Sequence, residues 1–494
     1  MTKNSLNMAD FISKQIPFKG DMTLEVAMKT NNEFRETMKE YPKLLDISKR
    51  IEGTLSSAGV HPAGILLCKD KIIERIPLRN SKGVIASQFD GPEVEGLGLL
   101  KYDLLALKTL TVIDKTIKMV KERYGKVIDI DGLEPNDKKV FEILNGRNST
   151  KDTLGVFQFE ASGISKLLRA IRVDGFNDMV VANALYRPGP LGSGMHDMYC
   201  GFKHGHAKIE YLHPKMGEVL KNTYGIMVFQ EDFMKVSTVM AGFTGGQSDS
   251  LRKAVGKKKK DLMQEMKGKF VDGCVKNGID IEIAKKIFEQ IEYFGGYGFN
   301  KSHSCAYAFI AYQTAWLKCY YPLEFMCNLL TSEINNSDKN EKLNMYIRAA
   351  ERDSITCAPA NINESGTEFK IVKQEFKNGT SRIGLIKPLT MLNGVGEKAV
   401  KNIVENQPFK NLEDFVKRTD ARVVNTRVFA AMVEAGCMDK VWSMPRSVLL
   451  TEYPEMKKKS VKDKKDKIKQ DKEMEQYGNN TLFGEAGCAD KLEI

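Results

Sequence analysis

The chain has 494 residues, 42% of them apolar and 28% charged, and a net charge of +11, which excludes global disorder and weakly indicates a polyanionic partner. No apolar run reaches the roughly 18–20 residues of a membrane span, and the first residues do not resemble a secretory signal, so we expect no membrane partner. Nine scattered cysteines without a Cys-x-x-Cys pair disfavour a disulfide scaffold and a zinc ribbon, and predict a cytoplasmic protein.

The length suggests about three or four domains, and the first of them alternates between helical and strand-like patterns. Residues 20–52 have the apolar spacing of helices, and residues 59–103 contain short apolar runs typical of strands. A helical period returns from Leu104 to Val120, which predicts Asp103 at a strand-to-helix junction. The strand-like runs are Ile65–Leu67 and Ile72–Ile73, and the turn signal is Asn80–Gly83.

Helical patterns dominate the rest of the chain. They run from about residue 134 to 330, interrupted by glycine-rich turns, and again from about 392 to 440, with a mixed, strand-containing segment at 355–390. Beyond residue 443 the sequence becomes lysine-rich. The stretch Lys457–Lys472 holds nine lysines and three aspartates, and we interpret it as a solvated helix or linker rather than a dedicated binding site.

Asp103 is the first candidate for chemistry. A single aspartate at the end of a strand is usually a helix cap or a turn former. Lys101, however, lies two residues earlier, so on a strand both side chains point to the same face. A carboxylate and an ammonium group presented together suit a site for a metal ion and a metal-bound phosphate.

A basic cluster and a glycine-rich loop are the next candidates. The cations of the segment 252–260 would repel one another unless an anion such as phosphate lies nearby. The loop from Tyr297 to Ser304 combines glycines with aromatic, amide and basic side chains, which is typical of loops that stack on a base and reach a sugar or phosphate. The alternative for His303 is a helix-capping or buried histidine.

A third candidate is the turn Gly394-Val-Gly396-Glu-Lys398, which is followed by a helix. It resembles a helix-hairpin-helix, in which a glycine turn lets backbone N–H groups meet a nucleic-acid phosphate without reading sequence. Many other helix-to-helix turns also carry two glycines.

These pieces together resemble the alpha subunit of bacterial replicative DNA polymerase III, a family C DNA polymerase. The matching motifs follow the family's order from about residue 10 to about residue 485, and several are long and specific. They are His61–Gly64, Gly98–Thr111, Val156–Gly163, Arg187–Met195, Tyr224–Glu231, Leu251–Lys259 and Gly296–Ala308.

The resemblance implies a multidomain α+β protein. Residues 1–130 would form the second part of a nucleotidyltransferase-type palm with a helical segment that connects to the thumb, and residues 131–350 the large, mostly helical fingers. Residues 351–442 would form a mixed segment with the helix-hairpin-helix. Residues 443–494 would be a lysine-rich linker that ends in a clamp-binding tail.

The resemblance also assigns roles to single residues. Asp103 matches the third palm carboxylate, which is catalytic and a ligand of Mg²⁺, whereas Arg187 matches a fingers motif without an assigned role. The positions implied near the incoming nucleotide are Lys101, Arg252, Lys253, Tyr297 and Asn300. The candidates for DNA binding are Lys257, Lys258, Lys259, Gly394, Gly396 and Lys398. Leu482 and Phe483 resemble the apolar end of a sliding-clamp motif, in which Asn479 stands where the family has glutamine. The alternative is a tail whose apolar tip folds back on its own domain.

One part of the family pattern is missing. The family's other two palm aspartates lie in a Pro-Asp-x-Asp-x-Asp motif before the matched region, and this sequence does not contain it. Two-metal catalysis needs cations about 3.5–4 Å apart, bridged by carboxylates, which Asp103 alone cannot supply. We therefore expect part of a replicative DNA polymerase that transfers nucleotides from dNTPs to a primer 3′-hydroxyl, active only with a second polymerase fragment that carries the missing aspartates.

Two alternatives stay open at this point. The chain is either one half of a polymerase divided between two genes, as in some phage genomes, or a shortened piece of a bacterial enzyme. A non-catalytic subunit that binds primer–template DNA and the sliding clamp is the alternative function.

Overall fold

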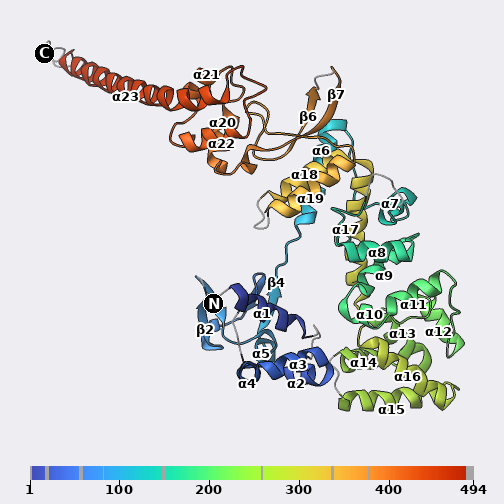
Figure 1. Cartoon of the computed structure of the whole chain (residues 1–494). Coiled ribbons are helices and arrows are strands. Elements are labelled where there is room, and N and C mark those ends of the chain that lie inside the picture. Colours follow the sequence, from blue (N-terminus) through green and yellow to red (C-terminus); the bar gives the residue numbers. More distant parts are fainter. Residues whose placement is uncertain are drawn as a thin grey trace, which may run out of the picture. The chain divides into compact units, whose positions relative to one another are not determined.

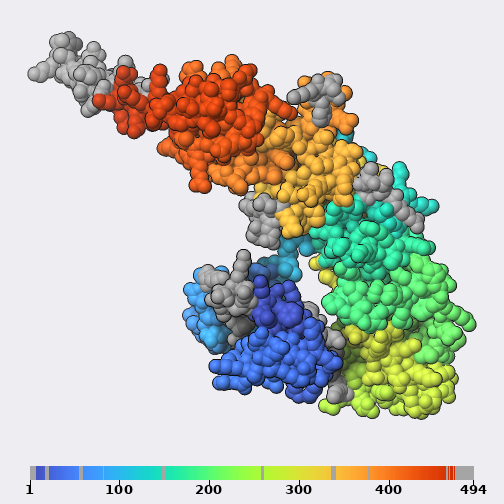
Figure 2. All heavy atoms as spheres, in the orientation of Figure 1, coloured from blue at the N-terminus to red at the C-terminus, as the bar shows by residue number. Residues whose placement is uncertain are grey.

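The computed structural model describes residues 3–16, 22–54, 59–81, 83–146, 152–256, 260–334, 339–375 and 379–485 (Figure 1). The other residues are grey in the space-filling view (Figure 2). The chain divides into two compact units, Met1–Ala106 and Leu107–Ile494. Within the described residues, no helix is both long enough and apolar enough to cross a bilayer.

The first unit combines short helices with two small antiparallel sheets. Strand β1 pairs with β4, and β2 pairs with β3 in a hairpin. The helices are α1 (Lys3–Lys14), α2 (Leu24–Thr30), α3 (Asn32–Glu40), α4 (Pro42–Ile51), the 3₁₀ helix η1 (Ile72–Glu74) and α5 (Gly91–Gly96). The strands are β1 (Gly64–Leu67), β2 (Leu78–Ser81), β3 (Val84–Ser87) and β4 (Leu100–Asp103).

The patterns of the first unit predict most of these elements. The helical spacing of residues 20–52 corresponds to α2, α3 and α4. The turn signal Asn80–Gly83 overlaps the last two residues of β2 and precedes β3, and its Lys82 lies outside the described residues. The strand predicted at Ile72–Ile73 is wrong, because the amides of Glu74 and Arg75 bond back to the carbonyls of Lys71 and Ile72 at 3.0 and 2.9 Å and close a 3₁₀ turn.

The helix expected from Leu104 begins later. The amide of Leu104 still donates to the carbonyl of Ala63 at 2.8 Å, which extends the pairing of β1 and β4 by one bond. Helix α6 therefore starts at Lys108, and Asp103 is the last residue of its strand, as expected.

The second unit begins as a large helical assembly. Its helices are α6 (Lys108–Tyr124), α7 (Lys138–Leu144), α8 (Ser162–Ile171), α9 (Phe176–Leu185), α10 (Pro188–Gly192), α11 (Met195–Lys203), α12 (Pro214–Leu220), η2 (Lys221–Thr223), α13 (Gln230–Ala241), α14 (Gly245–Gly256), α15 (Lys260–Lys276), α16 (Ile281–Gly295), α17 (Lys301–Tyr320), α18 (Pro322–Glu333) and α19 (Lys339–Arg352). One continuous apolar core runs through α7 to α17, and Phe229, Phe233, Phe270 and Phe288 in it are almost fully buried.

Local sequence signals explain where these helices start and stop. The Asp280 carboxylate accepts the amides of Glu282 and Ile283 at 2.8 and 3.1 Å and so caps α16. Helix α13 ends at Ala241 and is capped by Gly242, whose φ of +68° favours glycine. The predicted helical character of residues 134–330 is confirmed.

The second unit continues into a small mixed sheet and a helical hairpin region. Strand β5 (Cys357–Ala358) is parallel to β7 (Ser381–Ile386), and β6 (Lys370–Glu375) is antiparallel to it. The following elements are η3 (Leu389–Met391), α20 (Glu397–Glu405), α21 (Leu412–Arg418), α22 (Thr426–Glu434) and α23 (Arg446–Glu485).

The long helix α23 is anchored at its start. Leu449 and Tyr453 are buried in the core of α20 to α22, and the Tyr453 ring stacks on Phe429 with centroids 3.8 Å apart. The lysine-rich stretch is therefore the continuation of a helix whose first turns pack against α20 to α22. The multidomain α+β class expected from the sequence is confirmed.

Candidate active site

The pairing of β1 with β4 places the first candidate residues on one face of a two-stranded sheet. Lys101 lies opposite Leu66, and Asp103 lies opposite Gly64. The Lys101 Nζ donates to both carboxylate oxygens of Asp103, each at 2.7 Å. The two side chains therefore share a face, as their spacing predicts.

His61 completes this cluster and was missed by the sequence reasoning. Its Nδ1 lies 3.7 Å from the Asp103 Oδ1. A Cβ on Gly64 would lie 2.8 Å from His61 Nδ1 and 3.3 Å from Asp103 Oδ1, so the glycine makes room for both side chains. The available signal was the motif His61–Gly64 itself, in which a glycine follows three residues after the histidine.

Electrostatics keep the Asp103 carboxylate ionised. The hydrogen bond from Lys101 holds the pKa of Asp103 below its ordinary value, and the charges of Lys101 and His61 act in the same direction. The side chain is 40% exposed, so this carboxylate is available to a solvent cation. Ionised carboxylates are preferred ligands of Mg²⁺.

The opposite face of the same sheet is apolar and exposed. Alternation along the two strands sends Ile65, Leu67, Leu100 and Tyr102 to this face, where they are 46%, 49%, 58% and 53% exposed. We call these four residues the apolar sheet face. Isolated exposed apolar residues are ordinary, but a contiguous set on one sheet is typical of a surface that another element covers.

The glycine-rich loop Tyr297–Asn300 lies in the second unit and is held by the segment Val228–Glu231. The Gln230 amide donates to the Phe299 carbonyl at 2.8 Å, and the Phe299 amide donates to the Val228 carbonyl at 3.2 Å. The loop thus joins, through one short bridge, a motif about 70 residues earlier in the chain.

The Asn300 side chain is engaged within the protein. Its Oδ1 accepts the His303 amide at 2.7 Å and caps α17, and its Nδ2 donates to Glu231 Oε1 at 3.2 Å. The imidazole of His303 is exposed and lies against the Tyr307 ring, with centroids 4.2 Å apart. The role of Asn300 near the nascent base pair or its sugar stays a prediction.

Arg252 and Lys253 lie on α14 and share one carboxylate. The Arg252 Nη2 contacts Asp249 Oδ1 and the Lys253 Nζ contacts Asp249 Oδ2, each at 2.8 Å. The two hydrogen bonds hold the pKa of Asp249 below its ordinary value. Sequence reasoning named the cations but missed the aspartate that fixes them. Lys257, Lys258 and Lys259 lie outside the described residues.

The candidate helix-hairpin-helix turn is exposed. Gly394 has φ +86°, a conformation that favours glycine, and Gly396 is the N-cap of α20. Lys398 lies in the first turn of that helix and is exposed, whereas Val395 between the glycines is buried and anchors the turn. At the other end of this region, Leu482 and Phe483 belong to α23, but their side chains lie outside the described part.

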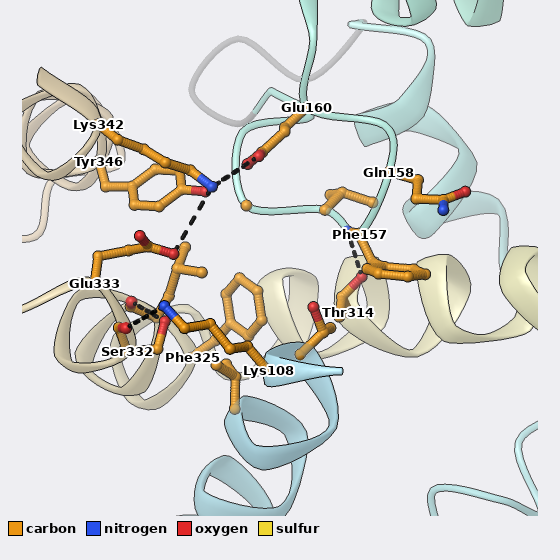
Figure 3. A pocket seen from close by; sticks show the side chains of 15 residues that line it. Lys108, Phe157, Gln158, Glu160, Thr314, Phe325, Ser332, Glu333, Lys342 and Tyr346 are labelled. Atoms are coloured by element: carbon orange, nitrogen blue, oxygen red, sulfur yellow. Dashed lines mark hydrogen bonds and ion pairs between the residues drawn. The ribbon is translucent and has the colours of Figure 1, made fainter. Parts of the chain in front are cut away.

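A small cavity of about 90 Å³ lies among α6, α17, α18, α19 and the loop of residues 155–160 (Figure 3). Lys342 contacts Glu160 at 3.2 Å and Glu333 at 3.7 Å, and the Tyr346 hydroxyl donates to Glu160 at 2.5 Å. Its charged groups neutralise one another, so we interpret it as a structural junction. Across the described residues, no group of three or more His, Cys, Asp or Glu side chains is arranged to hold a metal ion.

Three family models match the chain in order. The "Bacterial DNA polymerase III alpha NTPase domain" matches residues 2–106, and the "Bacterial DNA polymerase III alpha subunit finger domain" matches residues 109–278. A "Helix-hairpin-helix motif" matches residues 354–448. The boundary between the first two matches coincides with the division of the structure between Ala106 and Leu107.

Curated relatives match most of the chain. The DNA polymerase III subunit alpha of Campylobacter jejuni is 37% identical over 446 residues, which cover 88% of this chain and 36% of that protein. The Aquifex aeolicus protein of the same name is 42% identical over 414 residues, with 82% and 34% covered, and the Escherichia coli K12 protein is 37% identical over 452 residues, with 87% and 38% covered. The chain therefore spans little more than a third of the length of these relatives. It belongs to the family of bacterial DNA polymerase III alpha subunits and corresponds to a part of those proteins.

Proposed function

We propose that the chain is the palm-and-fingers part of a replicative DNA polymerase, which transfers a nucleotidyl group from a dNTP to a primer 3′-hydroxyl under the direction of a template. The observation that carries this proposal is the cluster of Asp103 and Lys101 on one sheet face, with His61 beside them, within the residues matched by the NTPase-domain family model. The names of the relatives support the same reaction.

The residues of this cluster fit part of a Mg²⁺ site. The ionised, partly exposed carboxylate of Asp103 is a suitable ligand, whereas its nearest charged neighbours are a lysine and a histidine rather than a second carboxylate. When bound, Mg²⁺ lowers the cost of charge that develops on the phosphate and the attacking oxygen. Asp103 would hold the cation, and Lys101 would turn from Asp103 to the phosphate that the cation binds.

A complementing polypeptide segment is the second element of the proposal. Two-metal catalysis needs further bridging carboxylates, and we place them on a second polymerase fragment that packs on the sheet of β1 and β4. The apolar sheet face supports this, because Ile65, Leu67, Leu100 and Tyr102 are exposed on a sheet of only two four-residue strands. A two-stranded sheet is marginal alone and gains stability from added strands or a packed helix.

The second unit would supply the contacts to the incoming nucleotide. Asp249 holds Arg252 and Lys253 beside one another on α14, a geometry suited to neighbouring oxygens of a triphosphate. We place Tyr297 near the nascent base pair, because aromatic rings provide stacking surface without reading sequence.

DNA and the sliding clamp are the partners proposed for the C-terminal region. The exposed turn with Gly394, Gly396 and Lys398 presents backbone amides and a cation to a phosphate. Leu482 and Phe483 would bind a clamp, since burying two such side chains is worth roughly 1.5–3 kcal/mol each before ordering costs. We place the protein in the cytoplasm, in accord with the absence of any disulfide among the eight described cysteines.

A non-catalytic subunit that binds primer–template DNA and the clamp is the second candidate. It is supported by the exposed turn of residues 394–398, which belongs to the second unit and not to the unit of the Asp103 cluster.

Asp103→Asn in the chain assembled with its complementing segment separates the two candidates. The change removes a metal ligand and preserves volume, so we expect primer extension to fall at least about 100-fold while DNA affinity is unchanged. Asp70→Asn is the matched control, because Asp70 is an exposed carboxylate of the same unit that pairs with Arg75. Equal extension by the Asp103→Asn variant and the control would contradict the catalytic assignment.

A further inference from the structure

Arg187 is the N-cap of α10, and it lies together with the first helical turn, up to Pro190, directly against the Tyr297–Asn300 loop. Its Nη2 donates to the Tyr297 carbonyl at 2.6 Å, and its Nε donates to the Ala184 carbonyl at 2.9 Å. The guanidinium carbon lies 4.4 Å from the centroid of the Phe299 ring. One side chain therefore fixes both the backbone of Tyr297 and the ring of Phe299, across 110 residues of sequence.

The charge of Arg187 is not used in an ion pair. Among the described residues no carboxylate lies within 4.0 Å of it, and its partners are two carbonyls and a ring. Burial lowers the pKa of Arg187, because it is unfavourable to take the charged guanidinium out of water. No carboxylate among the described residues offsets this cost. A half-buried arginine without a carboxylate partner adds little to the stability of the fold. The positions of its N–H donors, which reach the Ala184 and Tyr297 carbonyls, explain its presence better.

A second contact from the same turn acts on the Tyr297 ring. A Cβ on Gly189 would lie 2.6 Å from Tyr297 Cδ1 and 2.9 Å from Cε1. The φ of Gly189 is not in the left-handed region, so the backbone does not require glycine there. The missing side chain instead leaves the space that the Tyr297 ring occupies.

Tyr297 is held by other contacts than its neighbours are. Phe299 is also held by Val228 and Gln230 through backbone bonds, and Asn300 is also held by Glu231. The Tyr297 carbonyl accepts from Arg187, and the Tyr297 ring lies against Gly189 and, with centroids 6.4 Å apart, against the Tyr293 ring.

We infer that Arg187, together with Gly189, is a positioning residue that sets the Tyr297 ring in the orientation in which the loop receives the base of an incoming nucleotide. The inference rests on the proposed function for the place of that loop, and it adds the pair of residues on which the orientation depends. Arg187 acts through Tyr297 and does not itself contact the base.

Hydrogen exchange in the purified chain tests the contact without any assumption about activity. The Tyr297 and Gly298 amides donate to the carbonyls of Phe294 and Gly295 at 3.0 and 3.1 Å and report on the loop. In Arg187→Lys and Gly189→Ala we expect their exchange to rise about tenfold. Gly192→Ala is the matched control in the same helix, because a Cβ there meets nothing within 4 Å. Unchanged exchange in both variants would overturn the inference.

Nucleotide dependence in the assembled polymerase tests what the contact is for. The same two variants should raise KM for the dNTP about tenfold and change kcat less than about threefold, which a general loss of folded protein would not do. Arg418→Lys is the second control, since Arg418 holds the Pro408 carbonyl and faces the Phe409 ring in the hairpin region.

The two failures are distinguishable. If the wild-type assembly does not extend a primer, the proposed function is wrong, and the exchange data still decide whether Arg187 holds the loop. If the wild-type assembly is active and the variants keep the wild-type KM, the inference is wrong and the proposed function stands.

Discussion

The sheet of β1 and β4 in the first unit and the helical core of the second unit differ in how they bury apolar side chains. The sheet leaves Ile65, Leu67, Leu100 and Tyr102 exposed, and among the described residues of this unit the core beside it contains three buried ones, Ile76, Val94 and Leu99. The second unit buries residues such as Phe229 and Phe288 completely, in one core that runs through α7 to α17.

This difference separates two ways of building a site. In the second unit, packed helices fix the Tyr297 loop and the pair Arg252 and Lys253 without outside help. In the first unit, the Asp103 cluster is arranged by two short strands whose other face has no cover among the described residues of that unit. We therefore propose that the second unit holds its nucleotide contacts without a partner, whereas the first unit needs the complementing segment.

The largest expected effect is on the stability of the second unit. Phe288 is fully buried and packs on Phe270 with ring centroids 5.5 Å apart, so Phe288→Ala should lower the free energy of unfolding by about 3–5 kcal/mol. Leu100→Ala on the apolar sheet face should change it by less than about 0.5 kcal/mol. Urea unfolding of both variants measures this, and equal losses would remove the contrast between the two regions.

A pair of aspartates sharpens the comparison, because their pKa values move in opposite directions. Burial raises the pKa of Asp232 to about 6, above the unfolded value of about 3.9. Between pH 4 and 6 the unfolded aspartate loses its proton while the folded one keeps it, so the free energy of unfolding falls with rising pH, by up to about 3 kcal/mol. The pKa of Asp103 is lowered instead, so its contribution is present at neutral pH and is lost as the pH falls through its folded value.

Asp232→Asn tests whether Asp232 makes the free energy of unfolding fall with rising pH. An amide oxygen can still accept the Phe229 amide, which lies 2.9 Å from the carboxylate. The difference in stability between this variant and the wild type should change steadily from pH 4 to pH 6 and then level off. A pH-independent difference would show that Asp232 titrates normally.

The apolar sheet face should control assembly with the complementing segment. Ile65→Thr combined with Leu100→Thr removes two apolar side chains, and we expect the dissociation constant to rise roughly 10- to 100-fold. Ile85→Thr is the matched control, because Ile85 is 65% exposed but lies on the separate sheet of β2 and β3. Calorimetry gives the dissociation constants, and equal binding by the double variant and the control would place the partner elsewhere.

The smallest effect concerns DNA binding by the hairpin region. Lys398→Ala should weaken primer–template binding only a few-fold and reduce the slope of log affinity against log salt by about 0.9, the share of one phosphate contact. Lys401 on the same helix pairs with Glu397 at 2.8 Å, so Lys401→Ala should change the slope less. A slope unaffected by Lys398→Ala would remove this turn from the DNA interface.

Local signals made much of the fold predictable. The helices of residues 134–330, the strand that ends at Asp103 and the shared face of Lys101 and Asp103 follow from spacing alone. The two adjacent β-branched residues Ile72 and Ile73 led to the wrong prediction of a strand, because so short a run cannot outweigh a turn closed by backbone hydrogen bonds.

The arrangement of the site was less accessible. His61 meets Asp103, and Arg187 meets Tyr297, only because distant segments pack together, which no single-segment pattern encodes. Asp249 lies within one helical turn of Arg252 and was within reach, since residues three and four apart share a helix face.

Primer extension is the most direct test of the proposal that this chain supplies the fingers and one palm carboxylate, and that a second polypeptide supplies the other carboxylates. The purified chain, free of host polymerase, should give no measurable Mg²⁺-dependent extension alone, and addition of a polypeptide that carries the family's two missing palm aspartates should restore it. Asp103→Asn should abolish the restored activity. Robust extension by the chain alone would contradict the account, because one carboxylate cannot bridge the two metal ions of this reaction.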